Sequence, residues 1–454
     1  MAKVKKAKIA IEDILLPIDE HPYEIPQNWC WVKHNGVLDI SGGSQPAKSY
    51  FISEPTEGYI KLYQTRDYGD NPVPVYIPEK YATKTTLEGD ILLARYGGSL
   101  GKVFRAHEGA YNVALAKVIK LYPDLIDDEY LYKYYFTQFY QDFCVKASKG
   151  RSAQAGFNRD DMNNMPFPLP PLAEQRRIVE QIESLFTKLD EAKEKALSVV
   201  ESFESRKIAI LNNAFNGLYS TDWREKHHCT IDDWKDRKIN EICIPRAGFA
   251  FNSKKFTESG IQIIRMGNLY AGKLNLSRSP VFYDISDVDD NIIKRSMVHD
   301  GDILLTLTGT KYKRDYGYAV CIEGEHELLV NQRILCLSPT EKIDKEYLLY
   351  YLRSEIFRDV FFSNETGGVN QGNVSSKFVE NIEIKLPSIE EQKEISKILK
   401  NILTKEEQAK ELAEFVIEQI ELMKKSILAK AYRGELGTNI ATEESAIELL
   451  KSIL

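Results

Sequence analysis

The sequence predicts an α+β fold with two β-rich mixed domains and two long helices that pair as an antiparallel coiled coil about a pseudo-two-fold axis. Three observations lead to this prediction. One motif recurs at Gln175 and Gln392 and a second at Gly217 and Gly434, each pair 217 positions apart. Each copy contains a long run with a sustained apolar repeat, and short alternating, strand-like segments precede it. Such a long period indicates a duplicated domain plus helix, because solenoid repeats are far shorter.

Chain size and composition describe an ordinary globular protein. A chain of 454 residues with 43% hydrophobic content exceeds one core, so several structural units are expected. The sequence contains no run of 18 apolar residues, so it predicts no membrane span. We do not expect the basic start to be a signal peptide, because Glu12 and Asp13 interrupt the segment after it. The six cysteines show no C-x-x-C spacing, which predicts reduced thiols, no metal site and a cytoplasmic location.

The charge balance limits the kinds of partner. A net charge of −7 excludes a non-specific polyanion binder. The ranges 1–165 and 221–386 each carry nearly equal numbers of acidic and basic residues, so each has room for a local basic face. If DNA is the partner, we expect recognition by shape and base contacts, with help from other subunits.

The first domain is predicted at residues 1–166. Residues 26–29 lead into short alternating segments, and 89–93 read as a turn followed by a buried strand. The range 129–143 has the aromatic spacing of one amphipathic helix.

The second domain, predicted at 221–385, repeats this order. Trp234 stands where Trp29 stands, and the segments 260–264, 301–305 and 346–357 repeat 58–62, 89–93 and the aromatic helix. Gly89 and Gly301 are 212 positions apart, whereas Gly101 and Gly317 are 216 apart, so the second copy has four extra residues, in the loop 310–316. A constant skeleton with divergent loops is typical of one fold that reads two targets. The alternative is drift between the copies without any function in the loops.

The long helices are predicted at 167–220, as a central spacer, and at 386–437, as a distal spacer. Apolar residues alternate there at spacings of four and three, which predicts a coiled-coil seam. The predicted seam residues are Ile178, Ile182, Leu185, Leu189, Val199, Phe203, Ile395, Leu399, Ile402, Val416, Ile420 and Ile427. Ser388 with Glu391 forms a capping-box pattern, and Gly217 and Gly434 mark the helix ends. The alternatives are that each helix packs on its own domain or dimerises with another chain. Residues 438–454 read as a short tail helix.

The ordered set of motifs resembles the specificity (S) subunit of type I restriction–modification systems over about residues 20–437. The strongest matches are 168–181, 216–224 and 386–398. The resemblance implies two target recognition domains, each reading one half of an asymmetric, bipartite double-stranded DNA site. It implies that the helices set the spacing and dock two adenine methyltransferase (modification) subunits, which two restriction (motor/nuclease) subunits can join in defence against foreign DNA. The family's S subunit is non-catalytic, so S-adenosylmethionine, ATP and Mg are expected in the partner subunits.

The residues themselves show no catalytic block. No S-adenosylmethionine loop or phosphate loop is found in the sequence. Residues 169–172 look similar to a methyltransferase motif, but they lack the polar residue that would hold an adenine amino group. The adjacent ligands His227, His228 and Cys229 are typical of a solvated linker rather than of a metal site. Two alternatives to DNA recognition stay open at this point: a coiled-coil adaptor without DNA readout, and an enzyme with recognition domains attached.

Candidate DNA contacts are polar or basic residues in predicted loops. In the first domain they are Lys48, Arg66, Tyr68, Arg95, Tyr96, Lys102, Arg151 and Gln154. In the second domain they are Arg246, Lys254, Lys255, Arg265, Asn268, Lys311, Lys313, Arg314, Gln371 and Asn373. The alternative for each is an ordinary solvated side chain, and the matched Gln154 and Gln371 could instead satisfy the backbone of a turn. The extra loop with Lys311, Lys313 and Arg314 is the favoured contact.

Overall fold

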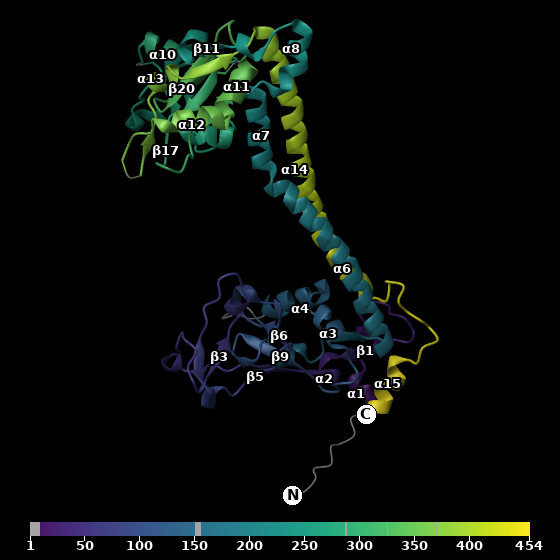
Figure 1. The fold of residues 1–454 in the computed structure, drawn as a ribbon. Coiled ribbons are helices and arrows are strands. Elements are labelled where there is room, and N and C mark those ends of the chain that lie inside the picture. Colours follow the sequence, from purple (N-terminus) through teal and green to yellow (C-terminus); the bar gives the residue numbers. More distant parts are fainter. Residues whose placement is uncertain (1–9, 150–155, 287, 325, 369) are drawn as a thin grey trace. The chain divides into compact units, whose positions relative to one another are not determined.

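The computed structural model describes residues 10–149 and 156–454 except 287, 325 and 369 (Figure 1). The chain forms two compact units, and each includes part of both long helices. Unit 1 comprises Met1–Ala196 and Phe415–Leu454, and unit 2 comprises Leu197–Glu414. Among the described residues, no helix has the length and apolar character needed to cross a membrane.

The globular part of unit 1 mixes short strands with short helices. Its helices are α1 (Ile11–Ile14), α2 (His34–Val37), α3 (Asp128–Tyr134), α4 (Gln138–Lys149), α5 (Arg159–Met162) and the tail helix α15 (Ala446–Ile453). Its strands are β1 (Cys30–Lys33), β2 (Leu38–Gly42), β3 (Tyr59–Tyr63), β4 (Tyr76–Pro78), β5 (Thr85–Thr86), β6 (Ile91–Ala94), β7 (Val103–Arg105), β8 (Gly109–Tyr111), β9 (Leu115–Lys120) and β10 (Pro166–Leu169).

The globular part of unit 2 follows the same order. Its helices are α8 (Thr221–His227), α9 (Ile239–Ile242), α10 (Asp290–Ser296), α11 (Lys345–Arg353), α12 (Glu355–Ser363) and α13 (Ser376–Glu380). Its strands are β11 (Lys235–Lys238), β12 (Cys243–Ala247), β13 (Phe256–Thr257), β14 (Ile261–Ile264), β15 (Phe282–Tyr283), β16 (Ile303–Thr306), β17 (Thr308–Gly309), β18 (Ala319–Cys321), β19 (Leu328–Val330), β20 (Ile334–Pro339), β21 (Gly372–Asn373) and β22 (Glu383–Leu386). The long helices are α6 (Leu172–Glu201), α7 (Phe203–Phe215) and α14 (Ile389–Ala431).

The two units share the strand order of one sheet and three strands of a second, in which the fourth strand joins at opposite edges in the two units. An antiparallel sheet has the order β2-β9-β6-β7 in unit 1 and β12-β20-β16-β18 in unit 2. A second sheet contains a parallel pair in each unit, β3 with β8 and β14 with β19. The first and last strands of each domain also pair, β1 with β10 and β11 with β22. The predicted α+β class with duplicated, β-rich mixed domains is therefore confirmed.

The long helices run antiparallel within each unit. In unit 1, Lys193 of α6 pairs with Glu421 of α14 at 2.5 Å, and Asp190, one turn earlier on α6, pairs with Lys424, one turn later on α14. In unit 2, Arg206 of α7 pairs with Glu406 at 2.8 Å, and Phe203 lies 4.8 Å from the ammonium of Lys410. Residue numbers that rise along one helix and fall along its partner show the direction directly.

Burial along the predicted seam is uneven. Ile178, Ile182, Phe203, Ile395, Leu399 and Ile420 are buried. Leu185, Leu189, Val199, Ile402 and Ile427 are half-buried. Val416 is 36% exposed, which is more than a seam position predicts. The stripe is therefore fully covered at the starts of α6 and α14, and buried and half-buried positions alternate along the rest of the helices.

The first long helix is interrupted, whereas a single continuous helix was predicted. The break lies at Ser202, between α6 and α7, and α14 continues for 43 residues without one. The Ser202 hydroxyl donates to the Ser198 carbonyl at 2.5 Å, and the Arg206 guanidinium donates to the Val199 carbonyl at 3.2 Å. Side-chain donors that take carbonyls from the helix ladder bend a helix at that point.

The aromatic helix predicted at 129–143 is also two helices, α3 and α4, and the same correction applies to α11 and α12 at 346–357. Thr137 accepts from the amide of Tyr140, and Ser354 accepts from the amide of Phe357. Each hydroxyl also donates to the carbonyl three residues earlier. A hydroxyl that satisfies the free amide of a new helix favours an N-terminus there, so the apolar spacing alone was misleading.

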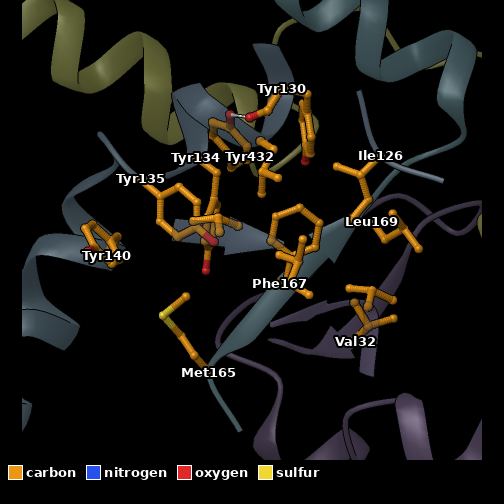
Figure 2. Close-up of a cluster of buried hydrophobic side chains, with 14 of the residues drawn as sticks. Val32, Ile126, Tyr130, Tyr134, Tyr135, Tyr140, Met165, Phe167, Leu169 and Tyr432 are labelled. Atoms are coloured by element: carbon orange, nitrogen blue, oxygen red, sulfur yellow. Dashed lines mark hydrogen bonds between the residues drawn. The ribbon is translucent and has the colours of Figure 1, made fainter. Parts of the chain in front are cut away.

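The core of unit 1 is completed by the end of α14. Tyr432 is buried against Tyr130 and Tyr134 of α3, and its hydroxyl donates to the Tyr130 carbonyl at 2.5 Å (Figure 2). The chain then turns at Gly434, where φ is +74° and a Cβ would lie 2.4 Å from Pro26. The tail helix α15 buries Ala446 and Leu450 in the same core. The last residues of the chain are therefore part of the first domain.

A repeated Glu-Gln pair opens both long helices. Gln175 accepts from the amide of Asp127 and donates to two carbonyls, and Gln392 makes the matching bonds to Asp344 and two carbonyls. Glu174 accepts from the Trp29 indole at 2.7 Å, and Glu391 accepts from the Trp234 indole at 3.1 Å. These bonds tie the start of each long helix to the tryptophan before the first strand of its domain and to the residue that caps α3 or α11.

The polar partners of the two glutamates differ. Glu174 also accepts from Asn439 of the tail at 2.7 Å, whereas Glu391 pairs with the buried guanidinium of Arg224 at 2.8 Å. Burial raises the pKa of Glu174, and its bonds from Trp29 and Asn439 offset this only in part. Ser388 caps α14 as predicted, but the Glu391 carboxylate bonds Arg224 and Trp234, so the expected reciprocal capping box is replaced by an ion pair.

Candidate nucleic-acid interface

Three loops of unit 2 meet beside the short strand pair of β17 and β21. The strands place Thr308 opposite Asn373. The Lys311 ammonium donates to the Gly367 carbonyl at 2.9 Å, which joins the loop 310–316 to the loop before β21. The Thr308 hydroxyl contacts the sulfur of Met266, so the turn after β14 reaches the same place. The geometry gathers these loops into one surface, which we call the loop cluster (residues 265–268, 308–316, 366–368 and 370–373).

The loop 310–316 is held in a strained shape by acidic side chains behind it. Tyr312 and Arg314 have φ of +67° and +51°, a region that non-glycine residues rarely adopt. The amide of Thr310 donates to Asp315 at 2.7 Å, and the amide of Tyr312 donates to Glu365 at 3.2 Å. The second oxygen of Glu365 accepts from the Tyr316 hydroxyl at 2.7 Å. The loop is therefore fixed by its own bonds and does not depend on a ligand for its shape.

Two pKa shifts follow from these bonds. Burial acts to raise the pKa of Asp315, but its hydrogen bonds with Thr310 and the charge of Lys313 outweigh it, so the pKa lies below its ordinary range. Burial and the neighbouring Glu365 raise the pKa of Tyr316. At neutral pH the aspartate is thus ionised and the tyrosine neutral, the forms that the bonds described above require.

The favoured basic residues of this loop lie in different settings. Arg314 is ion-paired with Asp359 at 2.8 Å and Glu355 at 3.2 Å, and its guanidinium lies 5.0 Å from the Phe362 ring. Lys313 is exposed, and Lys311 is half-buried. Arg314 therefore supports the loop from behind, while Lys313 is open to solvent.

Several other candidates of unit 2 are engaged in internal bonds. Arg246 donates to the buried carboxylate of Asp302 and to the Met297 carbonyl. Asn268 is buried and caps the turn at Arg265, whose guanidinium donates to the Ser279 carbonyl at 2.6 Å. Each of these side chains thus has at least one polar partner within the domain, and a contact of any of them with DNA stays a prediction. The exposed candidates are Lys254, Lys255 and Gln371, and Asn373 is half-buried.

The matching loops of unit 1 are less basic. Tyr96 pairs with Gly156 as Thr308 pairs with Asn373, so the same strand contact recurs. Arg95 is buried and donates to the Val113 carbonyl at 2.7 Å, and Tyr68 stacks on Phe104 at 4.5 Å with its hydroxyl enclosed. Arg95 is therefore turned into the domain, whereas Tyr68 is half-buried with only its hydroxyl enclosed.

The remaining candidates of unit 1 lie on the surface or outside the described residues. Lys48, Arg66 and Lys102 are exposed, and Tyr96 is half-buried beneath the Arg95 guanidinium at 4.8 Å. Arg151 and Gln154 lie outside the described residues. Within the part of the chain that the structure describes, no three metal-ligating side chains are grouped.

The sequence prediction named Tyr312 only as a member of the inserted run 311–314 and not among the individual candidate contacts. Tyr312 is 80% exposed, although it lies within the basic run that was predicted. The signal for it is the four-residue insertion itself. An aromatic residue in an insertion has no counterpart in the first copy, so the shared core of the two domains does not require it.

A second exposed surface lies on α14. Within unit 1, Phe415, Leu422 and Met423 are each at least half exposed, and their spacing places Phe415 and Leu422 two turns apart on one face. Large apolar side chains gathered on an exposed helix face mark interaction sites in many proteins.

Comparisons with known proteins agree with the geometry. The sequence profile described as "Type I restriction modification DNA specificity domain" matches residues 26–201 and 231–415. The chain is 24% identical to the type I restriction enzyme MjaVIII specificity subunit of Methanocaldococcus jannaschii over 92% of its own length and 95% of the relative's. It is 23% identical to the EcoKI specificity subunit of Escherichia coli K12, over 95% and 96% of the two chains. Among solved structures, the HsdS subunit from Thermoanaerobacter tengcongensis has a TM-score of 0.63 at 20% identity, with 92% of this chain and 100% of that chain covered. A chain from a structure concerning complex assembly and conformational transition of the type I R-M system has a TM-score of 0.67 at 20% identity, with 91% and 100% covered.

Proposed function

The chain belongs to the family of type I restriction–modification DNA specificity domains, and on that premise we propose how its two domains and helices divide the work. It is a DNA-recognition subunit of a type I restriction–modification complex, and catalysis resides in partner subunits. The alternative of an adaptor without DNA readout is not favoured, because the family match covers both domains.

Each domain reads one half of an asymmetric, bipartite DNA site in this proposal. The observation that carries it is the strand order of one sheet repeated with unlike loops at the same place. The loop 310–316 is longer than its counterpart and presents Tyr312 and Lys313, whereas in unit 1 the residues after β6 turn Arg95 inward. Two similar frames with different loop chemistry suit two different base sequences, because loops on a rigid scaffold carry specificity.

The long helices supply the spacing and the partner contacts in the same proposal. Their faithful repetition suits two copies of one modification subunit, and the exposed face with Phe415, Leu422 and Met423 suits an apolar partner surface. Two restriction subunits then join through the modification subunits. S-adenosylmethionine, ATP and Mg are held by these partners, and the complex acts in the cytoplasm, where its DNA is found.

Mapping of methylated adenines tests the division of labour. The chain and its modification subunits would be expressed together, and methylated sites would be read by single-molecule sequencing. Replacing 310–316 by the shorter loop of the first copy should alter one half of the mapped sequence and leave the other half unchanged. Loss or change of both halves together would contradict separate reading.

A second experiment tests the spacing. Seven residues, one heptad, would be removed from α6 and from the facing part of α14, so that the seam stays in register. We expect the number of unread bases between the half-sites to change, or the complex with the modification subunits to fail. An unaltered gap in an intact, active complex would refute the spacing role.

A further inference from the structure

Tyr312 stands out in the loop cluster because its large side chain is left in solvent. The residue is 80% exposed, and the Lys311 ammonium lies 5.0 Å from the ring. An exposed ring buries little apolar surface, so this side chain adds little to the stability of the folded chain through burial.

The backbone at this position is held at a cost. Tyr312 adopts φ of +67°, where glycine or asparagine is ordinarily found and a bulky residue is disfavoured. The bonds to Glu365 and Asp315, together with the ion pairs of Arg314, keep the loop in this shape. Strain that the surrounding structure maintains around one exposed side chain points to a use for that side chain.

The surroundings of the ring select the kind of partner. Lys311 and Lys313 flank Tyr312 in sequence, and Lys313 is exposed, so cations accompany the ring to whatever it contacts. The nearby carboxylates of Asp315 and Glu365 are occupied by bonds to the loop itself. An exposed aromatic side chain flanked in sequence by two lysines fits DNA, in which phosphates border the grooves that give access to the bases.

We propose that Tyr312 is an aromatic wedge that packs its ring against the bases of the half-site read by the second domain. Lys313 contacts the adjacent phosphate, and Arg314 only supports the loop. This rests on the proposed function, because it takes double-stranded DNA as the partner. The ring reads the ease with which a base step opens, so it contributes specificity without a hydrogen bond to a base edge.

The experiment uses the full chain in complex with its modification subunits and a duplex of the mapped methylation sequence, with 2-aminopurine placed at successive positions of the second half-site. Wild type and Tyr312→Phe should raise the fluorescence at one step, because both keep the ring. With Tyr312→Gly the fluorescence at that step should stay at the level of the free duplex. The variant should also bind the duplex about tenfold more weakly, since the stack between a base and an aromatic ring is lost. Tyr270→Ala is the matched control: that ring is also exposed in unit 2, but it packs on Tyr318 at 5.6 Å.

The melting temperature of the variant distinguishes a loss of DNA contact from a folding defect. Glycine is at ease at positive φ, so Tyr312→Gly should keep or raise the melting temperature of unit 2 while DNA binding falls. A glycine variant with wild-type affinity and fluorescence would overturn the wedge, and so would a phenylalanine variant as weak as the glycine variant. Loss of the modification subunits from the glycine variant would assign the tip to a protein partner instead. A wild-type complex that ignores the mapped duplex would contradict DNA recognition itself, whereas one that binds it without a fluorescence change would contradict the wedge alone.

Discussion

The same substitution at Glu174 and Glu391 should have unequal consequences for stability, although the two positions are equivalent in the repeat. Glu391→Gln removes the negative partner of Arg224, whose side chain is only 10% exposed. Breaking a buried ion pair typically costs about 3–5 kcal/mol, because the other charge stays buried without compensation. Arg224 keeps its bonds to Ser220 and to the Gly217 carbonyl, so we expect the lower end, about 3 kcal/mol of the free energy of unfolding of unit 2.

Glu174→Gln should change the stability of unit 1 by no more than about 1 kcal/mol at neutral pH, because the new amide oxygen can accept the same bonds from Trp29 and Asn439. The substitution also removes a buried charge. Since the folded-state pKa of Glu174 is raised above its unfolded value, the stability that it contributes is present at low pH and is lost as the pH rises through the folded-state pKa. The stability of unit 1 in the wild type should therefore increase relative to that in the Glu174→Gln variant as the pH falls from 7 towards 5.

Hydrogen exchange read by mass spectrometry is the suitable assay, because a chain of two units need not unfold in one step. Amides of β11 and β22 report on unit 2, and amides of β1 and β10 report on unit 1. Faster exchange should appear in unit 2 of the Glu391→Gln variant and in neither unit of the Glu174→Gln variant at pH 7. Equal losses in the two variants would refute the reasoning, because they would mean that Arg224 makes no difference to the cost.

Three further perturbations have definite expectations. Removal of residues 438–454 exposes the surface that Ala446 and Leu450 cover and breaks the 2.7 Å pair of Arg177 with Glu443. The free energy of unfolding of unit 1 should therefore fall by about 3 kcal/mol. Hydrogen exchange should accelerate in unit 1 and not in unit 2. Burial lowers the pKa of His34 from 6.5 to about 3, so its stabilising contribution is present above its unfolded pKa and is lost as the pH falls. Urea unfolding of unit 1 should show that the free energy of unfolding falls by about 2 kcal/mol between pH 7 and 5. The His34→Gln variant should not show this fall. Leu422→Glu on the exposed face of α14 should leave the melting temperature unchanged and weaken binding of the modification subunits roughly tenfold by calorimetry; unaltered binding would place their contact elsewhere.

Sequence periodicity was enough for the framework, since apolar spacing and glycine landmarks report directly on backbone geometry. Trp234 was matched to Trp29 by order alone, and both indoles donate to the glutamate that opens the following helix. Gly89 and Gly301 were matched by motif, and both have positive φ. Helix breaks were missed where a single hydroxyl, at Ser202, Thr137 or Ser354, competes with the apolar pattern.

The direction of a long polar side chain could not be predicted from sequence. Arg246 and Lys313 look alike as basic loop residues, yet Arg246 has a buried carboxylate within reach and Lys313 has none among its described contacts. The partner of Arg246, Asp302, is 56 residues away along the chain, and only the register of β12, β20 and β16 brings them together. Local patterns carry no information on such pairings, so the candidate DNA contacts remain predictions.

The return of Tyr432 and the tail to the first domain has a consequence for how the chain is made. Unit 2 is one continuous stretch, Leu197–Glu414, and can fold as soon as it leaves the ribosome, whereas unit 1 needs residues from both ends. At about 5–20 residues per second, the first domain waits roughly 10–50 s for the end of α14. During that interval Tyr130 and Tyr134 lack the ring that covers them. The half that is synthesised first is therefore finished last, and a nascent chain that stops early presents one completed reading domain and one that is open to chaperones and proteases.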